Sequence, residues 1–190
     1  MLNFYKLIEI FVSLQSLVIT TMLPVYIPLP FIYKSSNNFE FPITWQIPTI
    51  ILLTLIFNKK VVFRAFSIYI ILGLFILPVF HQGGSLGYLL TPNFGYLLGL
   101  YPLIKIIDNL NNRNKINFGN FLKNGFIAIG AMHLTGIFYN FIQTLFYRQF
   151  NLFLYNLGRY SLGKIGYHFL MLFPLLLLIK PIERLKHNKK

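Results

Sequence analysis

The side chains that could carry out acid–base or metal chemistry are few and scattered. The 190 residues include four acids, four His and no Cys. No apolar stretch contains two acids, so catalysis by paired carboxylates is not expected. The His residues lie far apart with no carboxylate at ligand spacing, and the absence of Cys excludes disulfides and thiolate metal sites. We therefore expect no metal site, no cofactor and no enzyme activity. The acids are Glu9, Glu40, Asp108 and Glu183.

One stretch has the spacing of a phosphate-binding loop. Gly158–Lys164 reads G-x-x-x-x-G-K, but Ile165 stands where such a loop has the Ser or Thr that holds magnesium. No strand pattern precedes it, and an apolar stretch follows. We do not expect this chain to hydrolyse ATP.

Two patterns inside apolar stretches have both a packing and a functional explanation. Gly95 and Gly99 form a G-x-x-x-G pair, for which close packing within one chain is favoured over dimerisation. His133 lies near the middle of an apolar run, where an ionisable group is either functional or bonded to a neighbouring helix. Both explanations of His133 stay open.

The composition indicates a membrane protein. Hydrophobic residues make up 56% of the chain and charged residues 11%, against about a quarter charged in soluble domains. We predict an all-α integral membrane protein, a single domain over residues 1–190, with six transmembrane helices of the length that a bilayer requires or nearly so. The six stretches are Leu7–Val25, Ile43–Phe57, Ala65–Val79, Leu86–Ile107, Phe118–Phe146 and Ile165–Ile179.

The distribution of positive charge predicts the orientation of these six helices. The chain has 17 Lys and Arg, 4 Asp and Glu, and a net charge of +13. Six crossings leave four of the 17 cations on the side opposite the termini: Lys34, Arg148, Arg159 and Lys164. By the positive-inside rule, both termini are cytoplasmic in a multi-pass protein of the plasma membrane. The basic residues then serve topology and the lipid bilayer, and nucleic-acid binding is not expected.

The connections on the outer side are rich in Pro, Gly and polar residues. They cover residues 24–46, 81–87 and 147–164. Prolines fix the backbone and glycines let it turn or approach a ligand. We expect structured outer loops around a small-molecule pocket that opens outward.

Two of these outer segments carry recognisable motifs. Phe41–Gln46 reads F-P-I-T-W-Q, and Leu77–Gly99 reads L-P-V-F-H-Q-G-G-S-L-G-Y-L-L-T-P-N-F-G-Y-L-L-G. In order and spacing they resemble the BioY family, the biotin-specific S components of energy-coupling-factor (ECF) vitamin transporters. The resemblance covers roughly residues 24 to 105. It implies a six-helix fold that captures biotin from outside and works with a transmembrane coupling subunit and two ATPase subunits.

The sequence also departs from the pattern of this family. Thr91 and Asn93 stand where the family commonly has Gly and Thr. Ser161–Tyr167 has no aspartate, whereas many members carry a P-G-D-x-x-K segment there. The small-residue face that relatives present to the coupling subunit has only partial counterparts on the first helix.

The resemblance and the chemistry of biotin together predict a binding site. Biotin offers ureido donors, a ureido carbonyl, an apolar ring and a carboxylate, so its site needs amides, aromatic walls and a cation. Gly83 and Gly84 are predicted to let backbone amides approach the ligand, while Gln46 fixes its polar end. The predicted substrate-binding residues are Thr44, Trp45, Gln46, Gln82, Gly83, Gly84, Tyr88, Asn93, Tyr96, Arg159 and Lys164.

Two alternatives remain beside biotin capture. The missing aspartate favours an S component for a different vitamin or small metabolite. An intramembrane enzyme is the least favoured, because Cys and paired carboxylates are absent.

Overall fold

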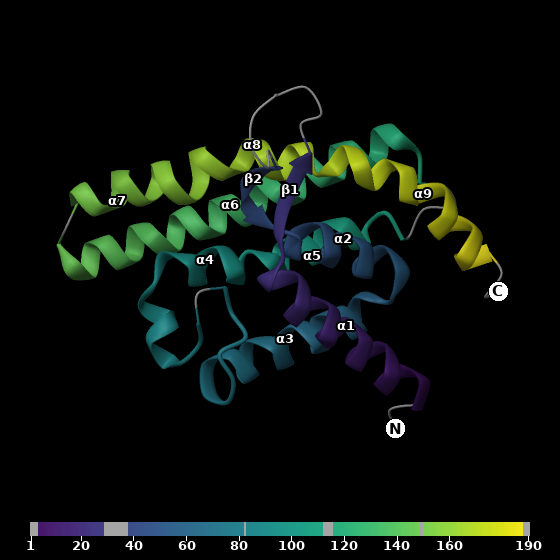
Figure 1. Cartoon of the computed structure of the whole chain (residues 1–190), viewed down its shortest axis with the longest axis horizontal. Helices are drawn as coiled ribbons and strands as arrows, with labels where there is room; N and C mark the ends of the chain where they lie inside the picture. The colour runs from purple at the N-terminus through teal and green to yellow at the C-terminus, as the bar shows by residue number, and fades with distance from the viewer. Residues whose placement is uncertain (1–3, 29–37, 82, 112–115, 149, 188–190) are drawn as a thin grey trace.

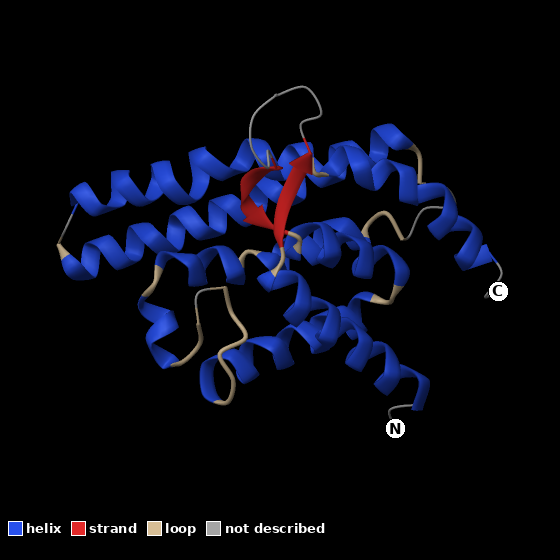
Figure 2. Ribbon diagram, in the orientation of Figure 1, coloured by secondary structure: helices blue, strands red, loops and turns tan. Residues whose placement is uncertain are grey.

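The computed structural model describes residues 4–28, 38–81, 83–111, 116–148 and 150–187. Its fold is helical, as the sequence predicts, with the addition of one β-hairpin (Figures 1 and 2). The helices form two layers: α6 to α9 lie along one side of the molecule and α1 and α3 along the other, with α2, α4 and α5 between them (Figure 1).

The first half of the chain contains three helices and the hairpin. Helix α1 is Phe4–Met22, α2 is Gln46–Ile56 and α3 is Lys59–Phe75. Asn58 caps α3, because its side chain accepts a hydrogen bond from the Lys60 amide at 2.9 Å. Strands β1 (Pro24–Pro28) and β2 (Asn38–Thr44) pair antiparallel in the connection between α1 and α2. The β-branched and aromatic residues of both strands favour this hairpin, which the helical prediction did not include.

The predicted fourth apolar stretch is divided into shorter helices. They are the 3₁₀ turn η1 (Leu86–Leu90), α4 (Pro92–Leu98) and α5 (Leu100–Asp108). Pro102 has no amide hydrogen to donate to the carbonyl of Leu98, four residues earlier, and α4 ends at Leu98. The proline therefore accounts for the break at Gly99.

The second half of the chain is helical almost throughout. It contains α6 (Phe118–Tyr147), α7 (Phe150–Asn156), the π-helical turn η2 (Leu157–Leu162), α8 (Gly163–Leu170) and α9 (Leu172–His187). The prediction of an outer loop over residues 147–164 is thus wrong for most of that stretch. Its Leu side chains favour helix, and α7 packs back along α6 (Figure 1).

A second proline marks the break between α8 and α9. Pro174 cannot donate to the carbonyl of Leu170, where α8 ends. The helical stretches on the two sides of this break are bent by 41°. The predicted sixth stretch therefore contains a kink rather than a straight helix.

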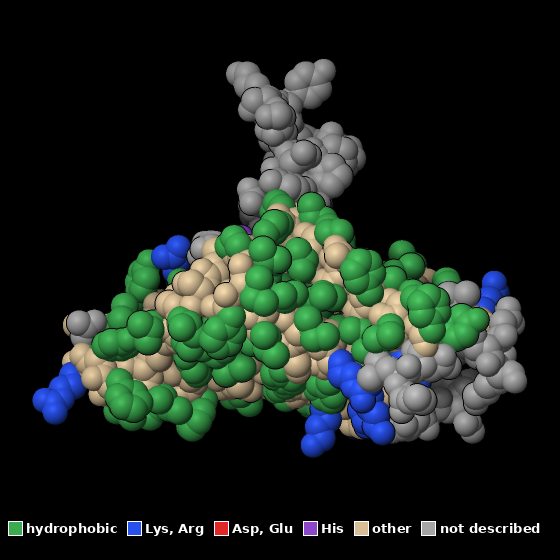
Figure 3. Space-filling view, turned by 90° about the horizontal axis from the view of Figure 1, so that it is seen from below, with side chains coloured by type: hydrophobic (Ala, Val, Ile, Leu, Met, Phe, Trp, Pro, Cys, Tyr) green, Lys and Arg blue, Asp and Glu red, His purple; other side chains and the backbone are tan. Residues whose placement is uncertain are grey.

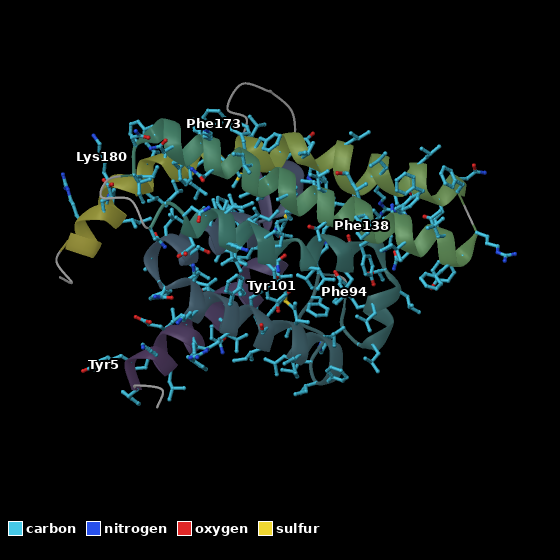
Figure 4. The ribbon with its side chains drawn as sticks, turned by 180° about the vertical axis from the view of Figure 1, so that it is seen from behind. Tyr5, Phe94, Tyr101, Phe138, Phe173 and Lys180 are labelled. Atoms are coloured by element: carbon cyan, nitrogen blue, oxygen red, sulfur yellow. The ribbon has the colours of Figure 1, made fainter. Side chains whose placement is uncertain are left out.

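Length and composition make α1 and α6 candidate membrane spans. A third candidate results if the bent stretch from α7 to α9 counts as one span. Hydrophobic side chains cover most of the face in Figure 3, and the Lys and Arg side chains lie at its edges. In Figure 4, Phe94 and Tyr101 lie in the middle of the molecule, while Tyr5 and Lys180 lie towards one end.

The G-x-x-x-G pair packs within this chain, as the sequence predicts. A Cβ on Gly99 would lie 2.5 Å from the carbonyl oxygen of Met132 on α6, and one on Gly95 would overlap Tyr139 on the same helix. These glycines let α4 and the start of α5 approach the backbone of α6.

Candidate functional site

A cavity of about 360 Å³ lies where the hairpin, α2, α3, α4 and α8 meet. This volume falls in the range of small-molecule sites, roughly 300–1,000 Å³. Its apolar walls come from the hairpin prolines, Ile47, Phe80, Leu97 and Met132.

The structure brings seven of the eleven predicted site residues to this cavity. They come from the end of β2, the start of α2, η1, α4, η2 and α8, which are far apart in sequence: Thr44, Gln46, Tyr88, Asn93, Tyr96, Arg159 and Lys164. Their role in substrate binding stays a prediction.

The other predicted residues lie elsewhere. Trp45 precedes α2 with 37% of its surface exposed and does not line the cavity. Gly83 (φ +125°) and Gly84 do not line it either, and a Cβ on Gly84 would lie 2.6 Å from the carbonyl oxygen of Gly73. Packing therefore accounts for Gly84 without a ligand. Gln82 lies outside the described residues.

Polar groups gather at the start of α2. Gln46 Nε2 donates a hydrogen bond to the hydroxyl of Tyr69 on α3 at 3.3 Å. The same hydroxyl donates to the carbonyl of Val79 at 3.2 Å and lies 3.0 Å from Thr21 Oγ1. Thr21, Gln46 and Tyr69 all line the cavity, so amide and hydroxyl groups are concentrated on this side of it.

Two cations line the part of the cavity formed by η2 and α8. Arg159 Cζ lies 5.6 Å and Lys164 Nζ 5.5 Å from the ring centroid of Tyr160, within cation–π range. Arg159 is exposed and Lys164 is partly buried. None of the described side chains that line the cavity is acidic. The local charge therefore favours an anionic group on a ligand.

A buried chain of hydrogen bonds reaches the cavity from α6. His133 Nδ1 lies 2.9 Å from Ser161 Oγ, and His133 Nε2 lies 3.0 Å from Nδ1 of His168, which lines the cavity. The structure therefore bears out the hydrogen-bonded explanation of His133. It also connects His133 to the site through His168.

His81 lies between α3 and η1 and lines the cavity. Burial lowers the pKa of its imidazole, and the positive charge of Lys164 lowers this pKa further. A hydrogen bond with the Thr21 backbone raises the pKa by a smaller amount. This shift favours the neutral form of the imidazole.

Sequence reasoning missed five polar residues of the cavity. They are Thr21, Tyr69, His81, Tyr160 and His168. His81 and Tyr160 adjoin predicted residues, and His168 lies one helical turn after Lys164, so spacing could have found these three. Tyr69 and Thr21 sit in apolar helices without any local signal.

Apolar helices around this polar-lined cavity define a helical membrane protein that can enclose a small molecule. The fold is that of a transporter S component: a solved structure described as the S component for biotin from an ECF-type ABC transporter aligns with 98% of this chain and 95% of its own, at a TM-score of 0.59 and 18% identity. The chain belongs to the BioY family, whose model matches residues 5–171.

One curated relative supports this assignment. A protein described as a probable biotin transporter BioY, from Lysinibacillus sphaericus, is 39% identical over 87 residues. The alignment covers 46% of this chain and 40% of that relative.

Proposed function

We propose that this chain is the membrane-embedded substrate-binding subunit for biotin uptake, acting as one domain and without a cofactor. The observation that carries the proposal is the meeting of Gln46 and Asn93 with Lys164 and Arg159 in one cavity. Amides match the ureido group of biotin, and cations match its carboxylate. Tyr88, Tyr96 and Phe80 provide the walls for the apolar ring system.

The family assignment and the fold support this proposal. The chain belongs to the BioY family, and the relative and the solved structure described above are both described in terms of biotin. By the same comparisons, we propose that the chain delivers biotin together with a transmembrane coupling subunit and two ATPase subunits.

We propose six membrane crossings with both termini in the cytoplasm. The arrangement in Figure 1 supports this topology: the start of α1, the turn from α2 to α3 and the end of α9 lie at the right. The turn from α6 to α7 and the segment between α3 and α4 lie at the left. The excess of Lys and Arg at the proposed cytoplasmic positions supports this orientation, and we propose the plasma membrane as the location of the protein.

A second candidate is an S component for a different vitamin. Ser161, in the segment where many relatives have an aspartate, is 2% exposed and bonded to His133. This segment therefore offers no carboxylate, which would accept a ligand N–H more strongly than a neutral group does.

Binding to the purified protein in detergent tests both candidates. Labelled biotin is expected to bind stoichiometrically, unchanged, and more tightly than thiamine or riboflavin. Folding is checked by monodisperse gel filtration and cooperative thermal unfolding. Folded protein that does not prefer biotin would exclude the first candidate and favour the second.

A further inference from the structure

The hydrogen bond between Gln46 and Tyr69 determines which atom of the Gln46 amide faces a ligand. The Tyr69 hydroxyl has one hydrogen to donate, and the buried carbonyl of Val79, 3.2 Å away, can only accept. No other hydrogen bond to that carbonyl is found among the described residues. Since an unpaired buried carbonyl is costly, the Tyr69 hydrogen is committed to Val79.

The remaining partners of the Tyr69 oxygen must therefore be donors. Thr21 has its own hydroxyl hydrogen, which it can give to the Leu17 carbonyl at 2.7 Å or to Tyr69 at 3.0 Å. The Gln46 amide lies 3.3 Å from the same oxygen. If its oxygen faced Tyr69, two acceptors would meet without a hydrogen between them. The NH₂ group must face Tyr69.

Tyr69 is itself held rigidly. Its side chain has no exposed surface and contacts Phe66 and Phe80, with ring centroids 6.1 Å and 5.3 Å away. A group fixed by packing and by three polar neighbours can hold the amide of Gln46 in one orientation.

We infer that Tyr69 is a positioning residue that makes Gln46 a hydrogen-bond acceptor in the cavity. Gln46 lines the cavity, and its Oε1 has no hydrogen-bond partner in the described part of the chain. This oxygen recognises an N–H group of the ligand. If the proposed function holds, that group is one of the two ureido N–H groups of biotin, so this inference rests on the proposal above.

The test compares biotin with its two cyclic carbamate analogues, in each of which a ring oxygen replaces one ureido N–H. The replacement adds no bulk but turns a donor into an acceptor. The parent protein is expected to bind biotin at least roughly tenfold more tightly than one of the two analogues. In the complex with that analogue, the ring oxygen and Gln46 Oε1 would face each other without a hydrogen between them. In Tyr69→Phe the amide is free to turn and donate, so this ratio should fall to about twofold.

Two further variants make the test decisive. Tyr101→Phe removes a hydroxyl that is hydrogen-bonded to Ser67 at a distance of 2.9 Å. Tyr101 does not line the cavity, so this variant should keep the parent ratio. Gln46→Met lacks both amide groups and should lose the discrimination even if Tyr69→Phe does not fold. Two outcomes overturn this inference but leave the proposed function intact. In one, the parent binds biotin but discriminates against neither analogue. In the other, folded Tyr69→Phe keeps the parent ratio. A folded parent that binds none of the three ligands overturns the proposed function and this inference together.

Discussion

His133 on α6 and His168 on α8 are joined by a hydrogen bond of 3.0 Å between Nε2 of the first and Nδ1 of the second. Both side chains are buried, and the ring centroids lie 5.2 Å apart. Each imidazole nitrogen in such a chain either donates or accepts, so the tautomers of the two rings depend on each other and on Ser161. The pair therefore ties the longest helix of the fold to a residue that lines the cavity.

Replacing His133 by Leu should destabilise the protein. The change leaves His168 Nδ1 and Ser161 Oγ without their partner in a buried place, at a cost of roughly 1–3 kcal/mol for each unpaired group. Thermal unfolding in detergent measures the effect. Leu134→Ala is the control, since Leu134 is on the same helix but 68% exposed, and a His133→Leu variant as stable as this control would contradict the prediction.

Two glycines on facing helices should respond to Ala with opposite signs. Gly99→Ala would place a methyl group 2.5 Å from the Met132 carbonyl oxygen, so α4 and α6 must separate, at a cost of roughly 1–3 kcal/mol or more. Gly130→Ala meets nothing within 4 Å and should stabilise α6 by up to about 1 kcal/mol. Melting temperatures of the two variants are compared with the parent, and equal shifts would argue against close packing at Gly99.

The helical class was predictable from composition, but the predicted ends of the helices differ from those in the structure. Apolar runs indicate burial in lipid or protein and say little about where a helix breaks. Pro102 and Pro174 carried that information, since α4 and α8 each end four residues before a proline. Helix α7 (Phe150–Asn156) lies in a stretch whose polar residues indicate a loop, although its Leu residues favour helix.

The site was predictable where its residues stand in unusual local sequence. Gln46, Asn93 and Lys164 belong to segments rich in Pro, Gly or polar residues, and all three line the cavity. Tyr69 lies inside an apolar helix, and only the fold brings it to Gln46 from 23 residues away. Side chains that position others are therefore missed by reasoning from motifs.

Gln46→Leu should weaken biotin binding. If Gln46 bonds a polar group of biotin in a closed cavity, the variant leaves that group unpaired, at roughly 1–3 kcal/mol, or about five- to a hundred-and-fifty-fold in Kd. Isothermal titration in detergent gives the ratio. Trp45→Leu, next to it but outside the cavity lining, should bind like the parent. Unchanged affinity in folded Gln46→Leu would place the polar contacts of biotin elsewhere.

Lys164→Met should lower the affinity for biotin but not for biotinamide. A hydrogen-bonded charge contributes roughly 1.5–3 kcal/mol, or about ten- to a hundred-and-fifty-fold, and biotinamide has no carboxylate to use it. Arg159 is exposed on the same part of the cavity, where solvent screens an ion pair. Arg159→Met should therefore weaken biotin binding less than Lys164→Met does. An equal loss for biotin and biotinamide in Lys164→Met would show that Lys164 does not bind the carboxylate.

Reporter fusions test the proposed topology most sharply at the turn between α2 and α3. Helix α2 has 11 residues and is about 16 Å long at 1.5 Å per residue, roughly half of a 30 Å hydrocarbon core. A crossing here thus needs the residues of β2 or a thinned bilayer in addition to the helix.

Fusions at Asn58, Asn112 and Asn188 should all report the cytoplasm, and a fusion at Asn37 the outside. The adjacent cations Lys59, Lys60 and Arg64 favour this result at Asn58. Outside signals at both Asn37 and Asn58 would mean that α2 does not cross, and the six-helix topology would have to be replaced.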